Sequence, residues 1–552
     1  MTSTLHSGAW PRANSLALAA FAGAVTVAGF APFYLFAVPV ATLAVLIVLW
    51  RRAAGRRAAA LIGFSFGLGY FLTGVSWVYV SLHDFGAMPA PLAGILTLLF
   101  CAYLALYPAV TGWIYHALGP RSALATLAAL PALWTLAEWL RGWLFTGFPW
   151  IALGYSQVPA SPLAGYVPVL GIYVASLATV VTAGAIVTLW ANWKDEGERM
   201  KAEGRRLIGK VTARRNGNSF FILHPSSFIV RRLRFLLHPS LFILAALLAS
   251  GYALQQLDWT APEGEPIVVS LLQGNIPQEM KWRDDKIEAT LEKYRRLVDS
   301  SNARLIVLPE TALPLFLHDV PQYYLNGFAS HSRSNGGDVL VGVPERTDKR
   351  DYFNSVLSFG ASPTQTYRKS HLVPFGEFVP LKPLFGWFLD VVQIPLLDFA
   401  RGAQTQQPLA VAGQRVAVNI CYEDAFGAEI IRQLLQATLL ANVSNVAWFG
   451  RSIAPQQHLQ ISQARALETG RYMLRATNTG MTAIIDPYGR VRKVAPEFTE
   501  SIVTGVVQGR GGATPYVRWG NTPIVALALL LALAGGWLAL REDGKLRDLP
   551  NR

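Results

Sequence analysis

Apolar runs long enough to cross a lipid bilayer recur through the first half of the chain, and one more lies near its end. A membrane-spanning helix needs about 20 mostly apolar residues. We predict such helices near residues 14–31, 33–50, 59–80, 90–116, 122–141, 166–192, 236–256 and 523–540. The pattern therefore predicts a bundle of eight transmembrane helices. The first two runs are short and closely spaced, so a helical hairpin is an alternative for them.

The pattern changes between residues 262 and 512, where short β-branched runs alternate with longer helical patterns. The runs PIVVSLLQ, ARLIVLPE, DVLVGVPE, VAVNICYE and TLLANVSN are typical of strands. Helical patterns lie around 284–300, from about 427, and around 457–470. Such alternation indicates an α/β sheet with covering helices. The region has the size of one large domain, so we predict an α/β domain between the seventh and eighth spans.

Composition supports a membrane protein and explains the charge. Of the 552 residues, 52% are hydrophobic and 15% charged, which is too apolar for an ordinary soluble protein. The net charge of +14 could suggest nucleic-acid binding, but the basic residues gather in loops after the second, sixth and eighth predicted spans. The loops SLHDFGAMPAP and TGFPWIALGYSQVPASP contain no lysine or arginine. Basic loops mark the cytoplasmic side, so the charge indicates topology and not a nucleic-acid partner.

These signals together predict the organisation of the chain. In chain order the predicted parts are membrane helices 1–6 in residues 1–192, a basic cytoplasmic loop at 193–235, helix 7 at 236–256, an extracytoplasmic catalytic domain at 262–512, helix 8 at 523–540, and a cytoplasmic tail at 541–552. Only helix 7 separates the basic loop from the α/β domain. One crossing therefore places that domain outside the cytoplasm.

Three strand-like runs end on reactive residues. LIVLPE ends at Glu310, QTYRK ends at Lys369, and VAVNI is followed by Cys421. Sites in α/β sheets gather where strands end and loops begin. The other cysteine, Cys101, lies in the apolar run LLFCAYLALY, so we expect two thiols and no disulfide.

The three residue types suit thiol-dependent acyl chemistry. Glu310 could take the proton from Cys421, and Lys369 could stabilise the oxyanion formed when the thiolate attacks a carbonyl. The backbone N–H of Tyr422 is a candidate second donor. No histidine pattern suggests a papain-like pair and no residues have zinc-ligand spacing, so we predict no metal and no cofactor.

The motifs VLPETALP, YRKSHLVPFGE and NICYED resemble the Glu–Lys–Cys signature of the nitrilase, or carbon–nitrogen hydrolase, superfamily. Coupled to so many predicted helices, the chain resembles the membrane-embedded bacterial branch of that superfamily. The resemblance extends to LRGWLFTGFPWIALGYSQ, QGNIPQEMKW, ARALETGRYMLRATNTG and TPYVRWGN. It covers essentially the whole chain apart from the 193–235 insertion.

The resemblance implies a nitrilase-like αββα sandwich mounted on eight transmembrane helices in the bacterial inner membrane, with the catalytic domain facing the periplasm. It also implies a ping-pong N-acyltransferase. The acyl chain would pass from a phospholipid, typically phosphatidylethanolamine, to a thioester on Cys421. The α-amino group of the diacylglyceryl-cysteine at the N-terminus of a lipoprotein would then accept the chain as an amide.

Residue roles follow from the same resemblance. Glu310 would be the general base, Lys369 the oxyanion stabiliser and Cys421 the nucleophile. The resemblance assigns supporting roles to Glu377, Tyr422 and Glu423, and places Trp282 on a substrate-facing loop. One position departs from the family pattern: Val446 stands where an aspartate is common, so a role tied to that carboxylate is not carried over.

Two apolar loop segments have open interpretations. Residues 380–399 form either an interfacial arm or lid dipping into lipid, or an ordinary core helix. A lid would keep water from a thioester. The loop TGFPWIAL, residues 146–153, forms either part of a lipid-binding floor or a turn packed on the bundle.

Two other functions compete with the acyltransferase. A membrane-anchored amidase or nitrilase would share the acylation step and pass the acyl group to water, but a single helix would suffice as its anchor. A transporter with an extracytoplasmic binding domain needs charges inside the membrane, and the predicted spans hold few. Glu138 and Arg141 lie near a helix end.

Overall fold

The computed structural model describes most of the chain. The described residues are 11–119, 122–213, 238–347, 351–380, 383 and 398–542. The predicted basic loop at 193–235 is helical up to residue 213, against the expectation of a loop, and its remainder lies outside the described residues. Nearly all of the predicted arm at 380–399 and of the predicted tail at 541–552 also lies outside them.

Each predicted span corresponds to a helix. These helices are α1 (Ala13–Thr26), α2 (Ala37–Arg52), α3 (Arg56–Val75), α5 (Ala90–Ala117), α6 (Leu130–Arg141), α8 (Ile172–Ala213), α10 (Pro239–Leu254) and α18 (Thr522–Glu542). Within the described residues, four stretches are long and apolar enough to cross a membrane: Arg56–Val75, Ala90–Ala117, Ile172–Glu198 and Thr522–Arg541. The remaining helices are shorter than the apolar runs suggested, because turns and irregular helical segments interrupt those runs. The helix positions were therefore predicted better than their lengths.

Within the helical bundle, defined here as the eight helices above, α3 packs tightly against α1 and α5. Close approach of backbones between helices requires small residues. A Cβ added to Gly63 of α3 would lie 2.3 Å from the carbonyl oxygen of Pro108 in α5. One added to Gly23 of α1 would lie 1.9 Å from the carbonyl oxygen of Phe66 in α3. Buried aromatic side chains, including Trp50 and Tyr70, fill the remaining space.

The sandwich domain, residues 261–511, contains two six-stranded sheets. In spatial order the first has β13 (Ser501–Val507), β2 (Ile267–Gln273), β3 (Leu305–Val307), β4 (Asp338–Arg346), β5 (Tyr352–Gly360) and β6 (Thr366–Arg368). The second has β12 (Val491–Val494), β11 (Ala483–Ile485), β10 (Met473–Thr477), β9 (Leu439–Ser444), β8 (Gln414–Ile420) and β7 (Leu409–Val411). The inner faces share one apolar core, in which Val269 and Val307 pack with Val418 and Ala441.

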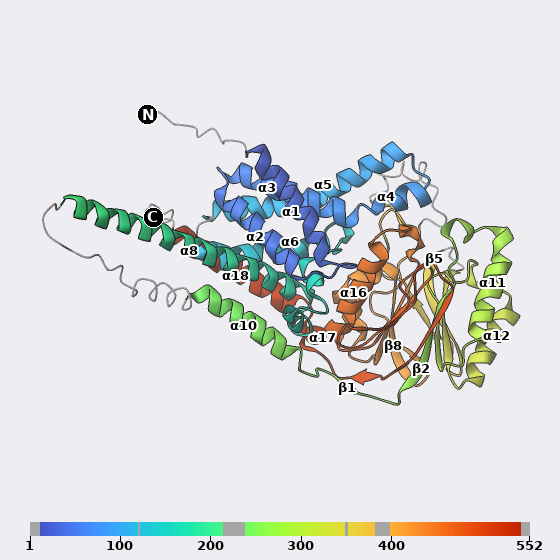
Figure 1. The fold of residues 1–552 in the computed structure, drawn as a ribbon. Helices are drawn as coiled ribbons and strands as arrows, with labels where there is room; N and C mark the ends of the chain where they lie inside the picture. The colour runs from blue at the N-terminus through green and yellow to red at the C-terminus, as the bar shows by residue number, and fades with distance from the viewer. Residues whose placement is uncertain are drawn as a thin grey trace, which may run out of the picture.

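Helices cover both outer faces of the sandwich. On the first sheet lie α11 (Asp284–Asp299) and α12 (Gln322–Ser334), and on the second lies α16 (Ala454–Thr469) (Figure 1). The layers therefore run helix, sheet, sheet, helix, which is the αββα sandwich that the sequence predicted. A short two-stranded sheet, β1 (Ala261–Pro262) with β14 (Arg510–Gly511), and the helix α17 (Pro515–Trp519) lie where the sandwich joins α10 and α18.

Parallel strands at the centre of each sheet place their carboxyl ends along one edge. In the first sheet β2, β3 and β4 are parallel, and in the second β8, β9 and β10 are parallel. These strands are apolar and buried along most of their length, as expected for strands covered on both faces. The loops after β3, β8 and β9 therefore meet at one end of the sandwich.

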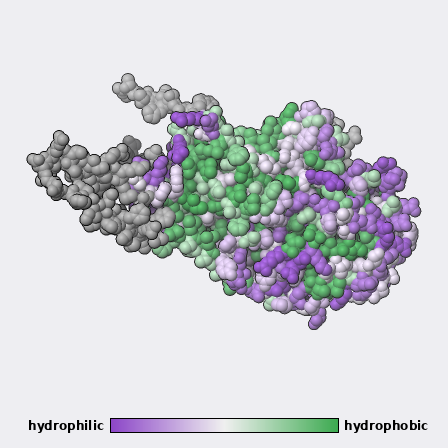
Figure 2. Space-filling model, viewed as in Figure 1, coloured by the Kyte–Doolittle hydropathy of each residue, from purple (hydrophilic) through white to green (hydrophobic). Residues whose placement is uncertain are grey.

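Helix α16 lies between the second sheet and the bundle (Figure 1). Fifteen of its 16 residues are buried, so it is covered on both sides. Gln460 Oε1 accepts a bond from the Ala31 N–H at 2.9 Å, and its Nε2 donates to the Val158 carbonyl at 3.1 Å. Figure 2 shows hydrophobic surface over the bundle and hydrophilic surface over the outer part of the sandwich. The α16 contact thus joins a lipid-compatible part of the chain to a water-compatible part.

Candidate active site

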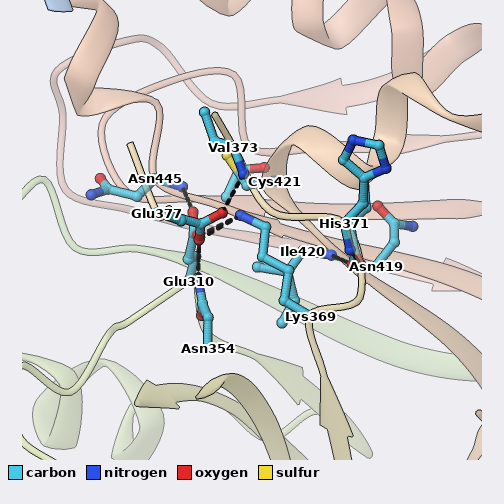
Figure 3. Close-up of polar contacts among 12 residues, drawn as sticks. Glu310, Asn354, Lys369, His371, Val373, Glu377, Asn419, Ile420, Cys421 and Asn445 are labelled. Atoms are coloured by element: carbon cyan, nitrogen blue, oxygen red, sulfur yellow. Dashed lines mark hydrogen bonds and ion pairs between the residues drawn. The ribbon is translucent and has the colours of Figure 1, made fainter. Parts of the chain in front are cut away.

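The structure brings Glu310, Lys369 and Cys421 together at the strand ends. Glu310 follows β3, Lys369 follows β6 directly, and Cys421 follows β8 and begins the 3₁₀ helix η9 (Cys421–Ala425). Figure 3 shows the carboxylate of Glu310 and the ammonium of Lys369 pointing toward each other beside the sulfur of Cys421. Three residues that are far apart in the sequence therefore share one site.

Two carboxylates share the lysine. Lys369 Nζ lies 2.9 Å from Glu377 Oε1 and 3.4 Å from Glu310 Oε1, and its side chain is 1% exposed. Asn354 Nδ2 donates to the same two carboxylate oxygens, at 2.7 Å to Glu310 and 3.1 Å to Glu377. The backbone N–H of Asn445 donates to Glu310 Oε2 at 2.8 Å. Every carboxylate oxygen of Glu310 is thus oriented by a donor.

The charges of the cluster favour an ionised glutamate and a protonated lysine. Burial alone would raise the pKa of Glu310, but Lys369, Lys281 and the donors outweigh burial and hold that pKa below its usual value. Burial alone would lower the pKa of Lys369, but Glu377 and Glu310 raise it above its usual value. At neutral pH Glu310 is therefore a carboxylate that can accept a proton.

The thiol is held in its neutral form until a base acts on it. Burial and the negative charge of Glu310 raise the pKa of Cys421 to about 12, while Lys369 opposes that rise. Cys421 also has a backbone φ of 54°, a left-handed conformation that is strained for a residue with a Cβ. The sharp turn at Cys421 places the sulfur beyond the end of β8.

Glu423 joins the two loops that carry Cys421 and Lys369. Its carboxylate accepts bonds from the backbone N–H groups of Ile420 at 2.7 Å, Ser370 at 2.6 Å and His371 at 3.0 Å, and from the Tyr367 hydroxyl at 2.9 Å. Without this carboxylate, the residues next to Cys421 and the residues next to Lys369 would lose their shared hydrogen-bond acceptor. Glu423 therefore fixes the distance between nucleophile and lysine.

Tyr422 connects the site to the bundle. Its hydroxyl donates to the Gly147 carbonyl at 2.9 Å, and its ring stacks on Trp150 with centroids 6.5 Å apart. Arg141 Nη1 donates to the Trp150 carbonyl at 2.8 Å and so anchors the same loop. The loop at 146–153 therefore lies directly against the residue that follows Cys421. Glu138 accepts the Leu153 N–H at 2.9 Å and so helps to hold the loop.

Several polar contacts of the site were not predicted. Asn354 lies inside β5, where a polar residue in an apolar strand is the only sequence signal. Lys281 donates to the backbone carbonyl of Glu310 at 3.1 Å, and burial lowers its pKa to about 8. Its neighbour Trp282 is partly exposed. Val446 is buried and follows Asn445, whose N–H binds Glu310.

Comparisons with known proteins identify the family of the chain. The family model of the apolipoprotein N-acyltransferase N-terminal domain matches residues 22–185, and that of carbon–nitrogen hydrolase matches residues 268–516. The apolipoprotein N-acyltransferase of Nitrosomonas europaea is 53% identical over 95% of this chain and 97% of its own length. That of Chromobacterium violaceum is 46% identical over 95% of this chain and 94% of its own length. A solved carbon–nitrogen hydrolase from Helicobacter pylori G27 is 16% identical with a TM-score of 0.34, covering 52% of this chain and 99% of that one.

Proposed function

Because the chain belongs to the apolipoprotein N-acyltransferase family, we propose that Cys421 carries the acyl group in transit and that Glu310 and Lys369 drive both transfers. The chain is an acyltransferase of lipoprotein maturation with a carbon–nitrogen hydrolase domain, and it acts on a lipoprotein in a membrane context. Family membership favours this function over the amidase that the sequence left as an alternative. The donor, the intermediate and the residue roles form the proposal.

In the first transfer Glu310 removes the proton from the Cys421 sulfur. The thiolate attacks the carbonyl carbon of the sn-1 ester of a phospholipid, with phosphatidylethanolamine as the proposed donor. Lys369 and the backbone N–H of Tyr422 stabilise the oxyanion. The ester C–O bond then breaks, and Glu310 returns its proton to the hydroxyl of the departing lysophospholipid. The products are a thioester on Cys421 and a lysophospholipid.

In the second transfer the acceptor is the α-amino group of the diacylglyceryl-modified N-terminal cysteine of a lipoprotein. The neutral amine attacks the thioester carbonyl, and Glu310 accepts the proton that the amine loses. The C–S bond breaks, the sulfur takes the proton from Glu310, and an amide is released. The same base and the same oxyanion donors therefore serve both halves of a ping-pong reaction.

Supporting residues keep this geometry. Glu377 orients Lys369 by accepting its Nζ at 2.9 Å, and Asn354 orients Glu310 by donating to its carboxylate at 2.7 Å. Glu423 and Tyr422 hold the turn that bears the nucleophile. Trp282 lies on a loop that we assign to substrate contact.

The membrane topology completes the proposal. All eight apolar helices would cross the bacterial inner membrane, with residues 262–512 in the periplasm and the basic loop at 193–235 in the cytoplasm. The single observation that carries the proposal is the buried Glu–Lys–Glu cluster beside a strained cysteine, at the point where the sandwich meets the bundle. Lipid substrates held in a membrane need a site at that level.

The test incubates purified full-length protein in detergent with phosphatidylethanolamine labelled in the sn-1 chain. We expect a hydroxylamine-sensitive label on the parent protein and none on a Cys421→Ala variant. Adding a diacylated lipopeptide should move the label into an amide. Label on the variant would refute the thioester, and release as free fatty acid in place of the amide would favour the hydrolase. Phosphatidylglycerol in a parallel reaction tests the head group.

A further inference from the structure

A row of buried polar residues crosses the centre of the second sheet directly behind Cys421. Asn419 of β8, Asn442 of β9 and Arg475 of β10 occupy paired positions on neighbouring strands. All three are buried, and Arg475 is 0% exposed. A buried charge is unfavourable unless it is paired and hydrogen-bonded. The proposed acyl-transfer steps use none of these side chains, so their presence in an apolar sheet needs a reason.

The row ends on the backbone of the nucleophile. Arg475 Nη1 donates to Asn442 Oδ1 at 2.6 Å. Asn442 Nδ2 in turn donates to the carbonyl oxygen of Cys421 at 3.2 Å and to Asn419 Oδ1 at 2.6 Å. A guanidinium has donors and no acceptor, so it can face only the oxygen of the Asn442 amide. Ser444 Oγ donates to the same oxygen at 2.7 Å. Arg475, the only charged donor of this pair, therefore directs that amide together with Ser444 and turns its NH₂ group toward Cys421.

A second arm of the same network reaches the other side of the turn. Arg475 Nη1 lies 3.6 Å from Asp424 Oδ2, and Ser462 Oγ, which donates to Asp424, accepts from Arg475 at 3.0 Å. Asp424 lies three residues after Cys421 in η9. His458 Nε2 lies 3.8 Å from the same carboxylate oxygen. The guanidinium is thus linked to the backbone of Cys421 through Asn442, and it lies next to the side chain of Asp424 just beyond Cys421.

These contacts can hold the strained backbone conformation of Cys421 in place. A left-handed φ of 54° at a residue with a Cβ persists only where surrounding contacts over-determine it. We propose that Arg475 is a positioning residue that, through Asn442 and Asp424, holds the Cys421 turn so that the thiol faces Glu310 and Lys369. This inference rests on the proposed function, because it assumes that the Cys421 thiol is the acyl carrier.

A matched control residue lies four positions earlier. Arg471 is also buried, and its guanidinium donates only to backbone carbonyls, those of Leu434, Ala437, Thr469 and Gly512. None of these carbonyls belongs to the Cys421 turn. An Arg→Lys change keeps a positive charge at either position. At position 475 it removes the Nη1 donor that binds Asn442 and Ser462, and at position 471 it removes the fork of three nitrogens that binds backbone carbonyls. The two variants therefore separate a general loss of stability from a specific loss at the nucleophile.

The experiment compares Arg475→Lys, Asn442→Asp and Arg471→Lys in purified full-length protein. The Asn442→Asp change keeps an acceptor for Arg475 and removes the donor to the Cys421 carbonyl. It therefore tests the link between Arg475 and Cys421 even where Arg475→Lys fails to fold. We measure the acylation rate at saturating phospholipid, the KM for phospholipid, iodoacetamide labelling of Cys421, and Tm. A displaced thiol should slow acylation by about 10²-fold.

We expect Arg475→Lys and Asn442→Asp to lose acylation rate and alter Cys421 labelling, with KM unchanged. Arg471→Lys should lose Tm and keep the acylation rate. Rates for Asn442→Asp and folded Arg475→Lys equal to the parent, or losses that track Tm as in Arg471→Lys, would overturn the inference. Label that persists in Cys421→Ala protein would instead overturn the proposed function, so the two failures are distinguishable.

Discussion

Two buried polar regions of the molecule differ in the kind of group they use. The acid–base cluster around Glu310, Lys369 and Glu377 consists of charged side chains in contact with one another. The contact between α16 and the bundle uses neutral amides beside one buried ion pair, Arg465 with Glu468, and Glu468 Oε1 accepts the Ile172 N–H at 2.8 Å. There Gln457 Oε1 accepts bonds from the indole N–H groups of Trp150 at 2.7 Å and Trp77 at 3.2 Å.

The difference reflects what each region must do. A group that moves a proton has to change its charge, so the cluster needs ionisable residues and neighbours that adjust their pKa values. A contact that only holds two parts together gains nothing from charge, and buried ion pairs are expensive to desolvate. The neutral glutamine side chains keep their hydrogen bonds to the backbone of the bundle whatever the protonation state of the site. The glutamine hydrogen bonds across the docking contact therefore do not depend on the charge of the catalytic cluster.

The largest effect should come from removing the nucleophile. Changing Cys421 to Ala should lower turnover on the order of 10⁶-fold, because no other group in the cluster can carry the acyl chain. Tm should change little, since only a small side chain is lost. Turnover with labelled phospholipid and lipopeptide measures the effect, and Cys101→Ala, a buried thiol in α5, is the control. Equal losses in both variants would contradict the proposal.

Changing Glu310 to Gln should separate proton transfer from thiol acidity. Acylation should fall by about 10²–10⁴-fold, because the general base is lost. Glu310 raises the pKa of Cys421, so its neutralisation should lower that pKa and increase the thiolate fraction at pH 9. We therefore expect faster iodoacetamide labelling of Cys421 at pH 9 than in the parent. Slower labelling would mean that Glu310 does not act on the thiol through its charge.

Changing Lys369 to Met should give the opposite result for labelling. Lys369 lowers the pKa of Cys421, so its loss should raise that pKa further and slow alkylation at pH 9. Acylation should fall by about 10²–10³-fold, because an oxyanion donor is missing. A pH profile of alkylation, read beside that of Glu310→Gln, checks the sign. Profiles that shift in the same direction would contradict the electrostatic assignment.

The smallest catalytic effect should come from the docking contact. Changing Gln460 to Leu leaves the Ala31 N–H and the Val158 carbonyl without their partner, which should reduce stability by about 1–3 kcal/mol. The acylation rate of the folded protein should stay close to that of the parent. The loss of Tm relative to the parent should be equal at pH 6 and pH 8, because the Gln460 amide does not change charge and Glu468, the carboxylate of this contact, is present in both proteins. A Tm loss that depends on pH would contradict the expectation that Gln460 contributes independently of charge, in contrast to the catalytic cluster.

Local pattern was sufficient for the main elements of the site. The runs ending at Glu310, Lys369 and Cys421 predicted three strand ends, and the alternation of strands and helices predicted an α/β sheet with covering helices. The αββα class was implied by the resemblance to the carbon–nitrogen hydrolase superfamily. Apolar runs also located the helices of the bundle, since hydrophobicity along one segment reflects burial of that segment. Helix ends were less predictable: α2 has 16 residues and α6 has 12, because turns and π-helical segments depend on neighbouring packing.

The sequence by itself determined which segments are apolar and which strands end on reactive residues. Only the tertiary structure decided that Asn354 lies between two carboxylates, that the Asn445 N–H binds Glu310, and that Arg475 reaches Cys421 through Asn442. The physical reason is that hydrophobic periodicity is a local property. Contacts between polar side chains depend on the register of neighbouring strands and on the packing of layers contributed by distant parts of the chain.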